Sequence, residues 1–274
     1  MIEELISIAL PIGNSEDLSF HARKTLENVE GVLAEDTRKF KDFLRASGLK
    51  VSCEVYALPA FEEKETDYSS FFKKLKGRRW AFVSDAGTPG VSDPGVWIMK
   101  AARIQRIRVR AIPGVSALSM ALQLTGGFGL PVCFLGFAPK KNKEDFFKKA
   151  ASAKSIIFFE SKHEIVSCLK TLVLLFPESK LNILREMTKE YEEFMEGTAA
   201  ELLPIFEKRV AAQDPIGELT LVLEGRGAEL SALQGLSAEE LIEFRSAAPT
   251  QAAKMLGKFT GLSKDKAYEM LSKK

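Results

Sequence analysis

The chain has 274 residues, of which 46% are hydrophobic and 28% are charged, and its formal net charge is +2. This composition is typical of a globular protein of one or two domains and excludes a largely disordered chain. The small net charge does not by itself indicate nucleic-acid binding. The three cysteines are far apart and favour neither a disulfide framework nor a zinc site, and no apolar run is long enough to cross a membrane. We therefore predict a cytoplasmic protein that is neither exported nor anchored.

Strand-like runs alternate with helical segments along the first half of the chain. The runs lie at 5–10, 31–34, 51–58, 80–83 and 109–112. This alternation predicts a mostly parallel sheet. A second set lies at 132–137, 155–160, 180–184, 194–197 and 219–224, again with helical segments between the runs. The predicted fold class is therefore α/β, with two α/β domains in tandem.

Breaks in these patterns predict the domain boundaries. The stretch T-G-G-F-G-L-P at 125–131 interrupts a helical pattern and provides a flexible joint. We predict an N-terminal α/β domain over 1–125, a C-terminal α/β domain over 126–226 and a small helical segment over 227–274. In the last segment, Ser237 and Glu240 form a capping-box signature. Its predicted helices at 249–259 and 263–271 are typical either of a helix-turn-helix or of a helical cap on the preceding domain.

The stretch 83–95 reads V-S-D-A-G-T-P-G-V-S-D-P-G and follows a predicted strand. It contains more glycine, proline and aspartate than a chain reversal requires, and glycine allows a ligand to approach the backbone. Similar loops follow two other strands, at 11–14 and 113–117. Parallel strands deliver such loops to one edge of the sheet, so we expect them to line one pocket. None fits the phosphate-binding motifs, so we do not expect a nucleoside triphosphate as the ligand.

Polar clusters that mix acidic and basic residues follow three further strands. They lie at 35–38, 160–163 and 185–189. Any one of them alone is more often a helix cap or an ion pair than a catalytic group. Their shared position at strand ends makes the set a candidate for chemistry. His163 has no second ligand at metal-binding spacing, so we predict no metal site.

Taken in order, these motifs resemble those of a known family. They are L-P-I-G-N-S-E-D-L at 10–18, A-E-D-T-R at 34–38, S-D-A-G-T-P-G-V-S-D-P-G at 84–95, P-G-V-S-A at 113–117, G-F-A-P-K-K at 136–141, F-E-S-K-H at 159–163 and R-E-M-T-K at 185–189. The set resembles the bacterial small-subunit (16S) ribosomal RNA (cytidine 2′-O)-methyltransferases, which are tetrapyrrole-methylase-like proteins. The resemblance covers residues 5 to about 225. The family usually has proline at the positions of Val115 and Lys162 and arginine at that of Glu164.

This resemblance implies two domains of the tetrapyrrole methylase type, with S-adenosylmethionine in a cleft between them, and frequent homodimers. It also implies methylation of a cytidine ribose in the decoding region of the small ribosomal subunit. By position, the cofactor-binding residues are expected to be Pro11, Ile12, Gly13, Asp85, Ala86, Gly87, Ser116, Ala117, Phe137, Ile216 and Gly217.

Five residues are candidates to polarise the ribose hydroxyl or to receive its proton, and none is singled out as the base. They are Glu35, Asp36, Arg38, Glu160 and Glu186. We expect the ribosomal RNA to be bound through Lys140, Lys141, Lys143 and His163. One alternative is a methyltransferase of the same fold that acts on a small molecule or a protein. Another is a non-catalytic RNA-binding protein that has kept the fold.

Overall fold

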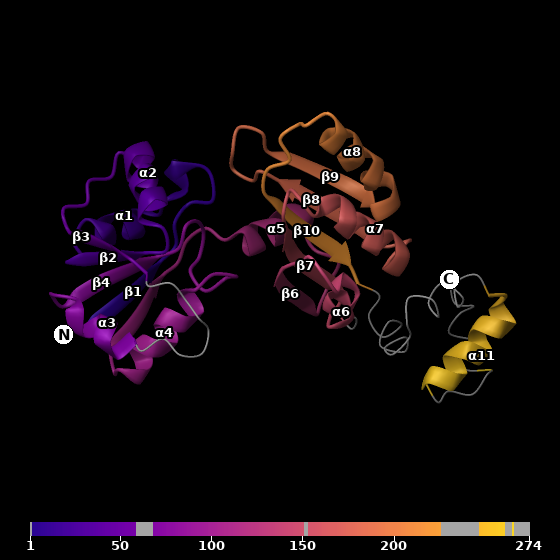
Figure 1. Ribbon diagram of the computed structural model, residues 1–274, viewed down its shortest axis with the longest axis horizontal. Coiled ribbons are helices and arrows are strands. Elements are labelled where there is room, and N and C mark those ends of the chain that lie inside the picture. Colours follow the sequence, from indigo (N-terminus) through magenta and orange to yellow (C-terminus); the bar gives the residue numbers. More distant parts are fainter. Residues whose placement is uncertain (1, 59–67, 151–152, 226–246, 261–264, 266–274) are drawn as a thin grey trace. The chain divides into compact units, whose positions relative to one another are not determined.

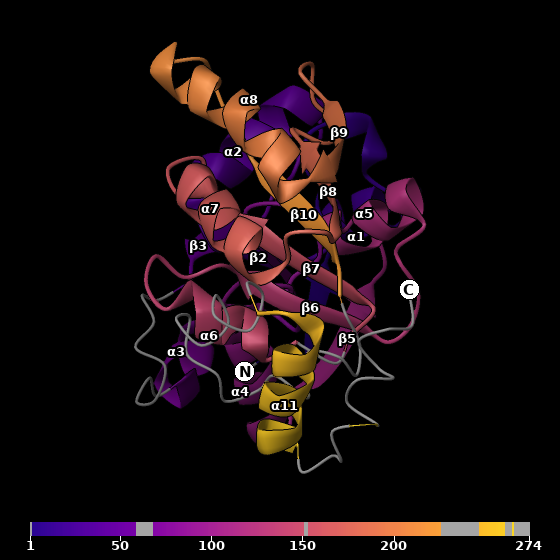
Figure 2. The same ribbon diagram turned by 90° about the vertical axis from the view of Figure 1, so that its right-hand side faces the viewer.

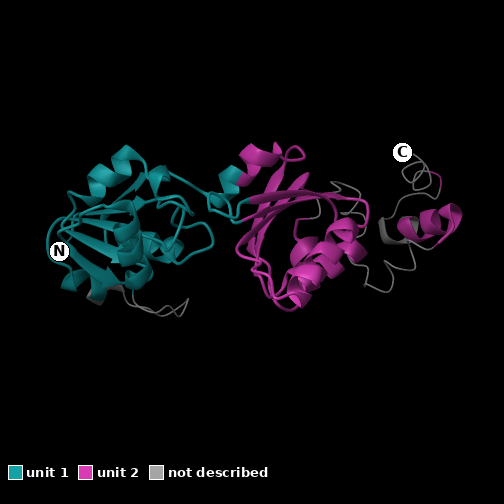
Figure 3. Cartoon of the chain, turned by 90° about the horizontal axis from the view of Figure 1, so that it is seen from above, with its two compact units in different colours: residues 1–120, 186–192 teal, residues 121–185, 193–274 magenta. Residues whose placement is uncertain are grey.

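The computed structural model describes residues 2–58, 68–150, 153–225, 247–260 and 265. The chain forms two compact units, one of residues 1–120 with 186–192 and the other of 121–185 with 193–274 (Figure 3). The boundary predicted after residue 125 falls at the end of helix α5 (Ala117–Thr125), close to the first of these divisions. Segment 186–192 differs from the prediction, because it belongs to the first unit although both neighbouring strands belong to the second.

The first unit contains a five-stranded sheet in the order β3-β2-β4-β1-β5. Figure 1 labels β3, β2, β4 and β1 of this sheet. In chain order the strands are β1 (Glu4–Ile8), β2 (Gly31–Ala34), β3 (Glu54–Ala57), β4 (Arg79–Val83) and β5 (Arg108–Ile112). Every neighbouring pair is parallel, which confirms the predicted parallel sheet for this unit. All four loops that follow β1, β2, β4 and β5 therefore emerge at one edge.

Helices cover both faces of this sheet. On one face, Val32 and Ala34 pack in a cluster with residues of α1 (Phe20–Leu26) and α2 (Thr37–Ser47). On the other face, Leu33 packs in a cluster with residues of α3 (Tyr68–Lys74) and α4 (Gly95–Ile104). Because β2 is buried on both faces of the sheet, its sequence is apolar throughout and does not alternate between apolar and polar residues. The unit is a three-layer α/β/α structure.

The second unit contains another five-stranded sheet, in the order β6-β7-β10-β8-β9. Its strands are β6 (Val132–Phe137), β7 (Ser155–Glu160), β8 (Lys180–Arg185), β9 (Glu193–Thr198) and β10 (Leu219–Glu224). Only β6 and β7 pair in parallel, and the other three pairs are antiparallel. The alternation of strands and helices did not indicate this mixed sheet. No helix separates β8 from β9, and β10 inserts between β7 and β8 in the opposite direction.

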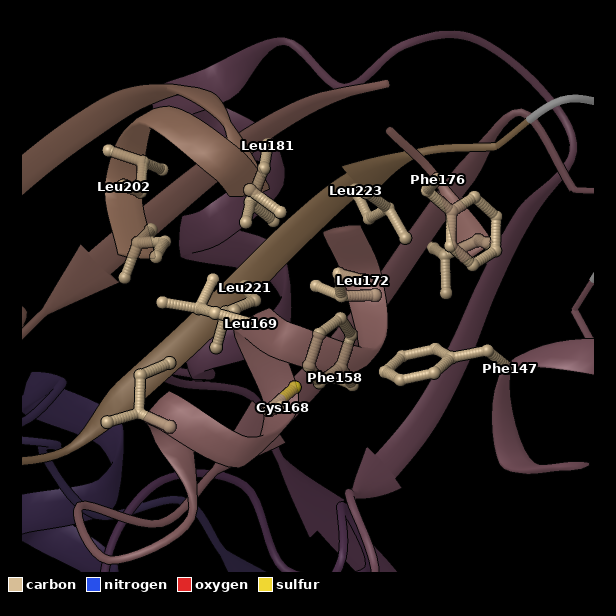
Figure 4. Close-up of a cluster of buried hydrophobic side chains, with 14 of the residues drawn as sticks. Phe147, Phe158, Cys168, Leu169, Leu172, Phe176, Leu181, Leu202, Leu221 and Leu223 are labelled. Atoms are coloured by element: carbon tan, nitrogen blue, oxygen red, sulfur yellow. The ribbon is translucent and has the colours of Figure 1, made fainter. Parts of the chain in front are cut away.

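One face of the second sheet is covered by α6 (Lys143–Lys148), α7 (Ile165–Leu175) and α8 (Ala199–Ala211), with α7 and α8 side by side (Figure 2). Side chains of these helices form the core of the unit with those of β7, β8 and β10 (Figure 4). In this cluster, Phe147 of α6 stacks edge-on against Phe158 of β7, with ring centroids 5.0 Å apart. Helix α6 is therefore held on the sheet by aromatic packing.

The helix predicted at 249–259 is present as α11 (Pro249–Thr260). The capping box of Ser237 and Glu240 and the helix predicted at 263–271 lie outside the described residues, apart from Asp265. Among the helices that the structure describes, none has the length and apolar character required to cross a bilayer.

Candidate active site

The three glycine-containing loops of the first unit meet at the carboxyl edge of its sheet. Leu10 and Gly87 form an isolated antiparallel bridge, in which the two amides donate to the opposite carbonyls at 3.0 and 2.9 Å. The Thr88 hydroxyl donates to the Val115 carbonyl at 2.8 Å. The loops after β1, β4 and β5 are therefore joined directly to one another, as their positions on parallel strands predict.

Gly87 lies at the centre of this junction. Its φ of +70° is in the left-handed region, and a Cβ at this position would lie 3.2 Å from Cγ2 of Ile12. Both facts favour glycine, because other residues adopt this conformation at a cost and a side chain would press on the neighbouring loop. Gly87 therefore allows the backbones of two loops to approach each other.

The second half of the 83–95 loop is organised by Asp93. Its Oδ1 accepts hydrogen bonds from the amides of Gly90 and Gly95, at 2.8 and 2.7 Å. Burial raises the pKa of Asp93, and these backbone hydrogen bonds oppose that shift. The aspartate therefore has a structural role in joining the loop to the start of α4.

Asp85 is held by residues that follow β2. Its Oδ1 accepts from the amide of Asp36 at 3.1 Å, and its Oδ2 accepts from Nζ of Lys39 at 2.6 Å. The amide of Asp85 in turn donates to Oε2 of Glu35 at 3.1 Å. Burial raises the pKa of Glu35, whereas the hydrogen bond to Asp85 raises that of Lys39. Lys39 was not predicted, because its contact with Asp85 spans 46 positions and no local pattern marks it.

Asp36 and Arg38 form a pair at the start of α2. Oδ1 of Asp36 accepts from the amide of Arg38 at 2.8 Å and so caps the helix. The guanidinium also donates to both carboxylate oxygens, at 3.1 and 2.7 Å, and this holds the pKa of Asp36 well below its usual range. The Arg38 side chain is 88% exposed. Asp36 therefore stabilises the start of α2, whereas the exposed side chain of Arg38 is accessible to an anionic substrate.

The candidates Glu160 and Lys143 are buried in the second unit, with exposed fractions of 2% and 5%. Nζ of Lys143 donates to the Pro139 carbonyl at 2.6 Å and to Oε2 of Glu164 at 3.3 Å, and it lies 3.6 Å from Oε2 of Glu160. Burial raises the pKa of Glu160, with the amide of Ser161 and the Lys143 charge opposing. The charge of Lys143 is enclosed and paired, which does not favour the RNA contact predicted for this residue. The burial of Glu160 likewise does not favour its predicted contact with a substrate.

The remaining basic candidates are exposed near this cluster. Lys140 and Lys141 follow β6, and His163 follows β7. Because β6 and β7 are parallel, these residues lie beyond the same edge of the second sheet. Lys140 and Lys141 therefore place positive charge at the surface beyond this edge, whereas the charge of Lys143 is buried.

The predicted cofactor residues of the second unit lie at that same edge. Phe137 is exposed, and its ring packs against Phe159 with centroids 5.2 Å apart. Ile216 is buried in the core, and its carbonyl accepts from Nε of Arg185 at 2.7 Å. Gly217 has a φ of +75°. Ile216 can therefore offer a ligand only its backbone, whereas Phe137 can offer its ring.

The fifth catalytic candidate, Glu186, belongs to the first unit. Its Oε1 accepts from Nζ of Lys189 at 3.1 Å, and its φ is +50°. In the described part of the chain, no group of three or more His, Cys, Asp or Glu residues is arranged to hold a metal ion.

Residues 4–203 match the family of Tetrapyrrole (Corrin/Porphyrin) Methylases. The chain is 36% identical over 228 residues to the ribosomal RNA small subunit methyltransferase I of Thermotoga maritima, covering 81% of this chain and 99% of that protein. It is 33% identical over 269 residues to the protein of the same name from Xylella fastidiosa, covering 95% of this chain and 96% of that protein.

Solved structures share the fold at lower identity. Uroporphyrin-III-C-methyltransferase from Thermus thermophilus aligns with a TM-score of 0.57 and 18% identity, over 84% of this chain and 97% of that one. A structure of that enzyme complexed with S-adenyl homocysteine aligns with a TM-score of 0.54 and 16% identity, over 83% and 99% of the two chains. These likenesses support the two-domain α/β architecture that the sequence predicted.

Proposed function

This chain belongs to the tetrapyrrole (corrin/porphyrin) methylase family, and from that premise we propose that it methylates small-subunit ribosomal RNA with S-adenosylmethionine as the methyl donor. The observation that carries the proposal is the identity of 33–36% to relatives named for this activity, which in one case extends over 95% of the chain. The tetrapyrrole-modifying neighbours are only 16–18% identical. The RNA substrate is therefore favoured over a small molecule, and the interlocked glycine loops argue against a non-catalytic scaffold.

The residues at the carboxyl edge of the first sheet fit S-adenosylmethionine, which carries an amine, a carboxylate, hydroxyls and a sulfonium but no phosphate. Gly13, Ala86 and Gly114 are small and exposed, and they leave backbone groups accessible. Asp85 offers a fixed, partly exposed carboxylate. We propose that the loops at 11–13, 85–87 and 116–117 hold this cofactor, together with Phe137 and the backbone of Ile216 and Gly217.

The finer proposal is transfer to the 2′-hydroxyl of a cytidine. The cofactor supplies an activated methyl group, whereas a 2′-hydroxyl is a weak nucleophile at neutral pH. The protein must therefore align the hydroxyl and assist the loss of its proton. Among the predicted candidates, Glu35 fits proton acceptance best, because burial raises its pKa and it is held next to Asp85. Arg38 is exposed to receive the RNA backbone.

The direct test is calorimetric titration with S-adenosylmethionine, followed by transfer of a tritiated methyl group to small ribosomal subunits that lack the modification. We expect binding, and label in a cytidine ribose. Binding without transfer to either the subunit or bare RNA would favour the small-molecule or protein substrate. Absence of cofactor binding would favour the non-catalytic alternative.

RNA binding is expected to depend on Lys140 and Lys141. Their combined replacement by alanine should weaken RNA affinity and lower the slope of log K against log salt by about one to two, because each phosphate contact releases about one counterion. Filter binding between low and moderate salt measures both quantities. Lys180→Ala is a matched control, because Lys180 is exposed at the start of β8, which runs parallel to β7, and so lies at the opposite edge of the sheet. An equal effect of the control would contradict the assignment.

The homodimer and the cytoplasmic setting expected from the sequence stay predictions. Size-exclusion chromatography with light scattering on the purified protein would test the first of them.

A further inference from the structure

Segment 186–192 lies against the first cofactor loop, and we propose that Thr188 is a positioning residue for that loop. This inference deepens the proposed function, because it concerns how the S-adenosylmethionine site is held in shape. The chain leaves the second unit after Arg185, packs on the first unit over 186–192, and returns to the second unit at Glu193. We call residues 186–192 the strap.

The strap contacts the loop at two neighbouring residues. The amide of Asn14 donates to Oγ1 of Thr188 at 3.1 Å, although the two residues are 174 positions apart. A Cβ on Gly13 would lie 2.5 Å from both Oγ1 of Thr188 and Cγ of Lys189, and 3.0 Å from the Met187 carbonyl oxygen. The side of Gly13 where a side chain would project is therefore occupied by the strap. Gly13 is required for the strap to dock, whatever its backbone contributes to the cofactor.

The strap has an unusual conformation that its own hydrogen bonds maintain. Glu186 and Thr188 have φ values of +50° and +64°, which are rare for residues other than glycine and rarest for a β-branched residue such as threonine. The amide of Thr188 donates to Oε2 of Glu192 at 2.6 Å, and the amide of Lys189 donates to the Glu186 carbonyl at 3.0 Å. Such conformations persist where the surroundings impose them, and here they direct the Thr188 hydroxyl to Asn14.

The contact with the strap reaches the centre of the site through adjacent residues. Ile12 precedes Gly13 and lies against Gly87. A Cβ on Gly87 would lie 3.2 Å from Cγ2 of Ile12. A shift of the loop at Gly13 and Asn14 would therefore move Ile12 relative to Gly87. In the chain the strap follows directly after β8, which ends at Arg185, and is followed directly by β9, which begins at Glu193.

The test is Thr188→Val, which keeps the size and β-branching of threonine and removes the hydroxyl. We expect the affinity for S-adenosylmethionine to fall about five- to tenfold, as for the loss of one hydrogen bond to a backbone amide, and the KM for the cofactor to rise by the same factor. The kcat should change little, and Thr188→Ser should restore affinity. Thr171→Val is the matched control, because the Thr171 hydroxyl bonds only to a helix carbonyl of α7 in the described structure.

Thr188→Gly guards against misfolding of the valine variant, because glycine adopts a φ of +64° without strain. It should lose affinity to a similar extent while it remains folded by circular dichroism. Wild-type affinity in both variants would overturn the positioning role and leave the proposed function standing. A lower kcat with unchanged KM would also overturn it, since that result indicates a smaller folded fraction. If the wild-type protein binds no S-adenosylmethionine, the proposed function itself fails.

Discussion

Gly87→Ala is expected to weaken the binding of S-adenosylmethionine by about 30-fold, which corresponds to ~2 kcal/mol. Gly87 has a φ of +70°, and the new Cβ would lie 3.2 Å from Cγ2 of Ile12. The free loop can relieve this strain by moving away from Leu10 and Ile12, and binding must then restore the strained conformation. Calorimetric titration measures the loss, and methyl transfer at subsaturating cofactor should fall by a similar factor.

The Gly48→Ala variant is the control for backbone strain, because it introduces a similar strain without a contact to the loops of the site. Gly48 ends α2 with a φ of +62°, and a Cβ there would meet nothing within 4 Å. The substitution should lower the free energy of unfolding by about 1 kcal/mol, as for other residues forced into this conformation, and leave cofactor affinity unchanged. If both alanine variants bound the cofactor as the wild type does, Gly87 would have no role in shaping the site.

Lys143→Met is expected to lower the free energy of unfolding by about 3–5 kcal/mol at pH 7, because it leaves the buried Glu160 without its counter-charge. Glu160 lies in the same enclosed cluster as the buried thiol of Cys168, whose pKa is raised by burial and then by the nearby Glu160 charge. Cys168 belongs to the hydrophobic core shown in Figure 4. The surroundings of Glu160 therefore offer few polar groups that could replace the ammonium of Lys143. Urea unfolding followed by circular dichroism measures the change.

The pH dependence of this loss follows from the raised pKa of Glu160. A carboxyl group whose pKa is higher in the folded than in the unfolded state is neutral below its ordinary pKa of 4.5 and does not destabilise the fold there. As the pH rises through the pKa of the folded state, its ionisation lowers the free energy of unfolding. Without Lys143 that pKa rises further, so the variant should lose more stability at pH 7 than at pH 5. Adding Glu160→Gln should remove most of this pH-dependent loss.

Lys148→Met, on the same helix, provides the control for the loss of a lysine charge. Lys148 pairs with Asp145 at 3.5 Å on the surface, where an ion pair contributes about 0–1 kcal/mol. Its replacement should therefore change stability little at either pH. A similar small effect at Lys143 would show that the buried pair contributes nothing to the fold.

The local pattern of the sequence was enough to predict the ten strands that the structure describes, because short apolar runs bounded by glycine, proline and polar residues are typical of strands. It also predicted that the loops after β1, β4 and β5 meet, since parallel strands deliver their ends to one edge. The family resemblance, which rests on motifs in those loops and on four further motifs, was confirmed by the match over residues 4–203 and by the relatives at 33–36% identity.

Only the tertiary structure decided the direction of the strands in the second sheet, the docking of 186–192 on the first unit, and the exposure of each charge. Lys140, Lys141 and Lys143 look alike in the sequence, yet the first two are exposed and the third is buried beside Glu160. The reason is that strand formation depends on neighbouring residues, whereas pairing order and burial depend on which distant surfaces α6, β7 and β10 present to one another. Contacts such as that between Asn14 and Thr188 join residues far apart in the chain, so no local pattern encodes them.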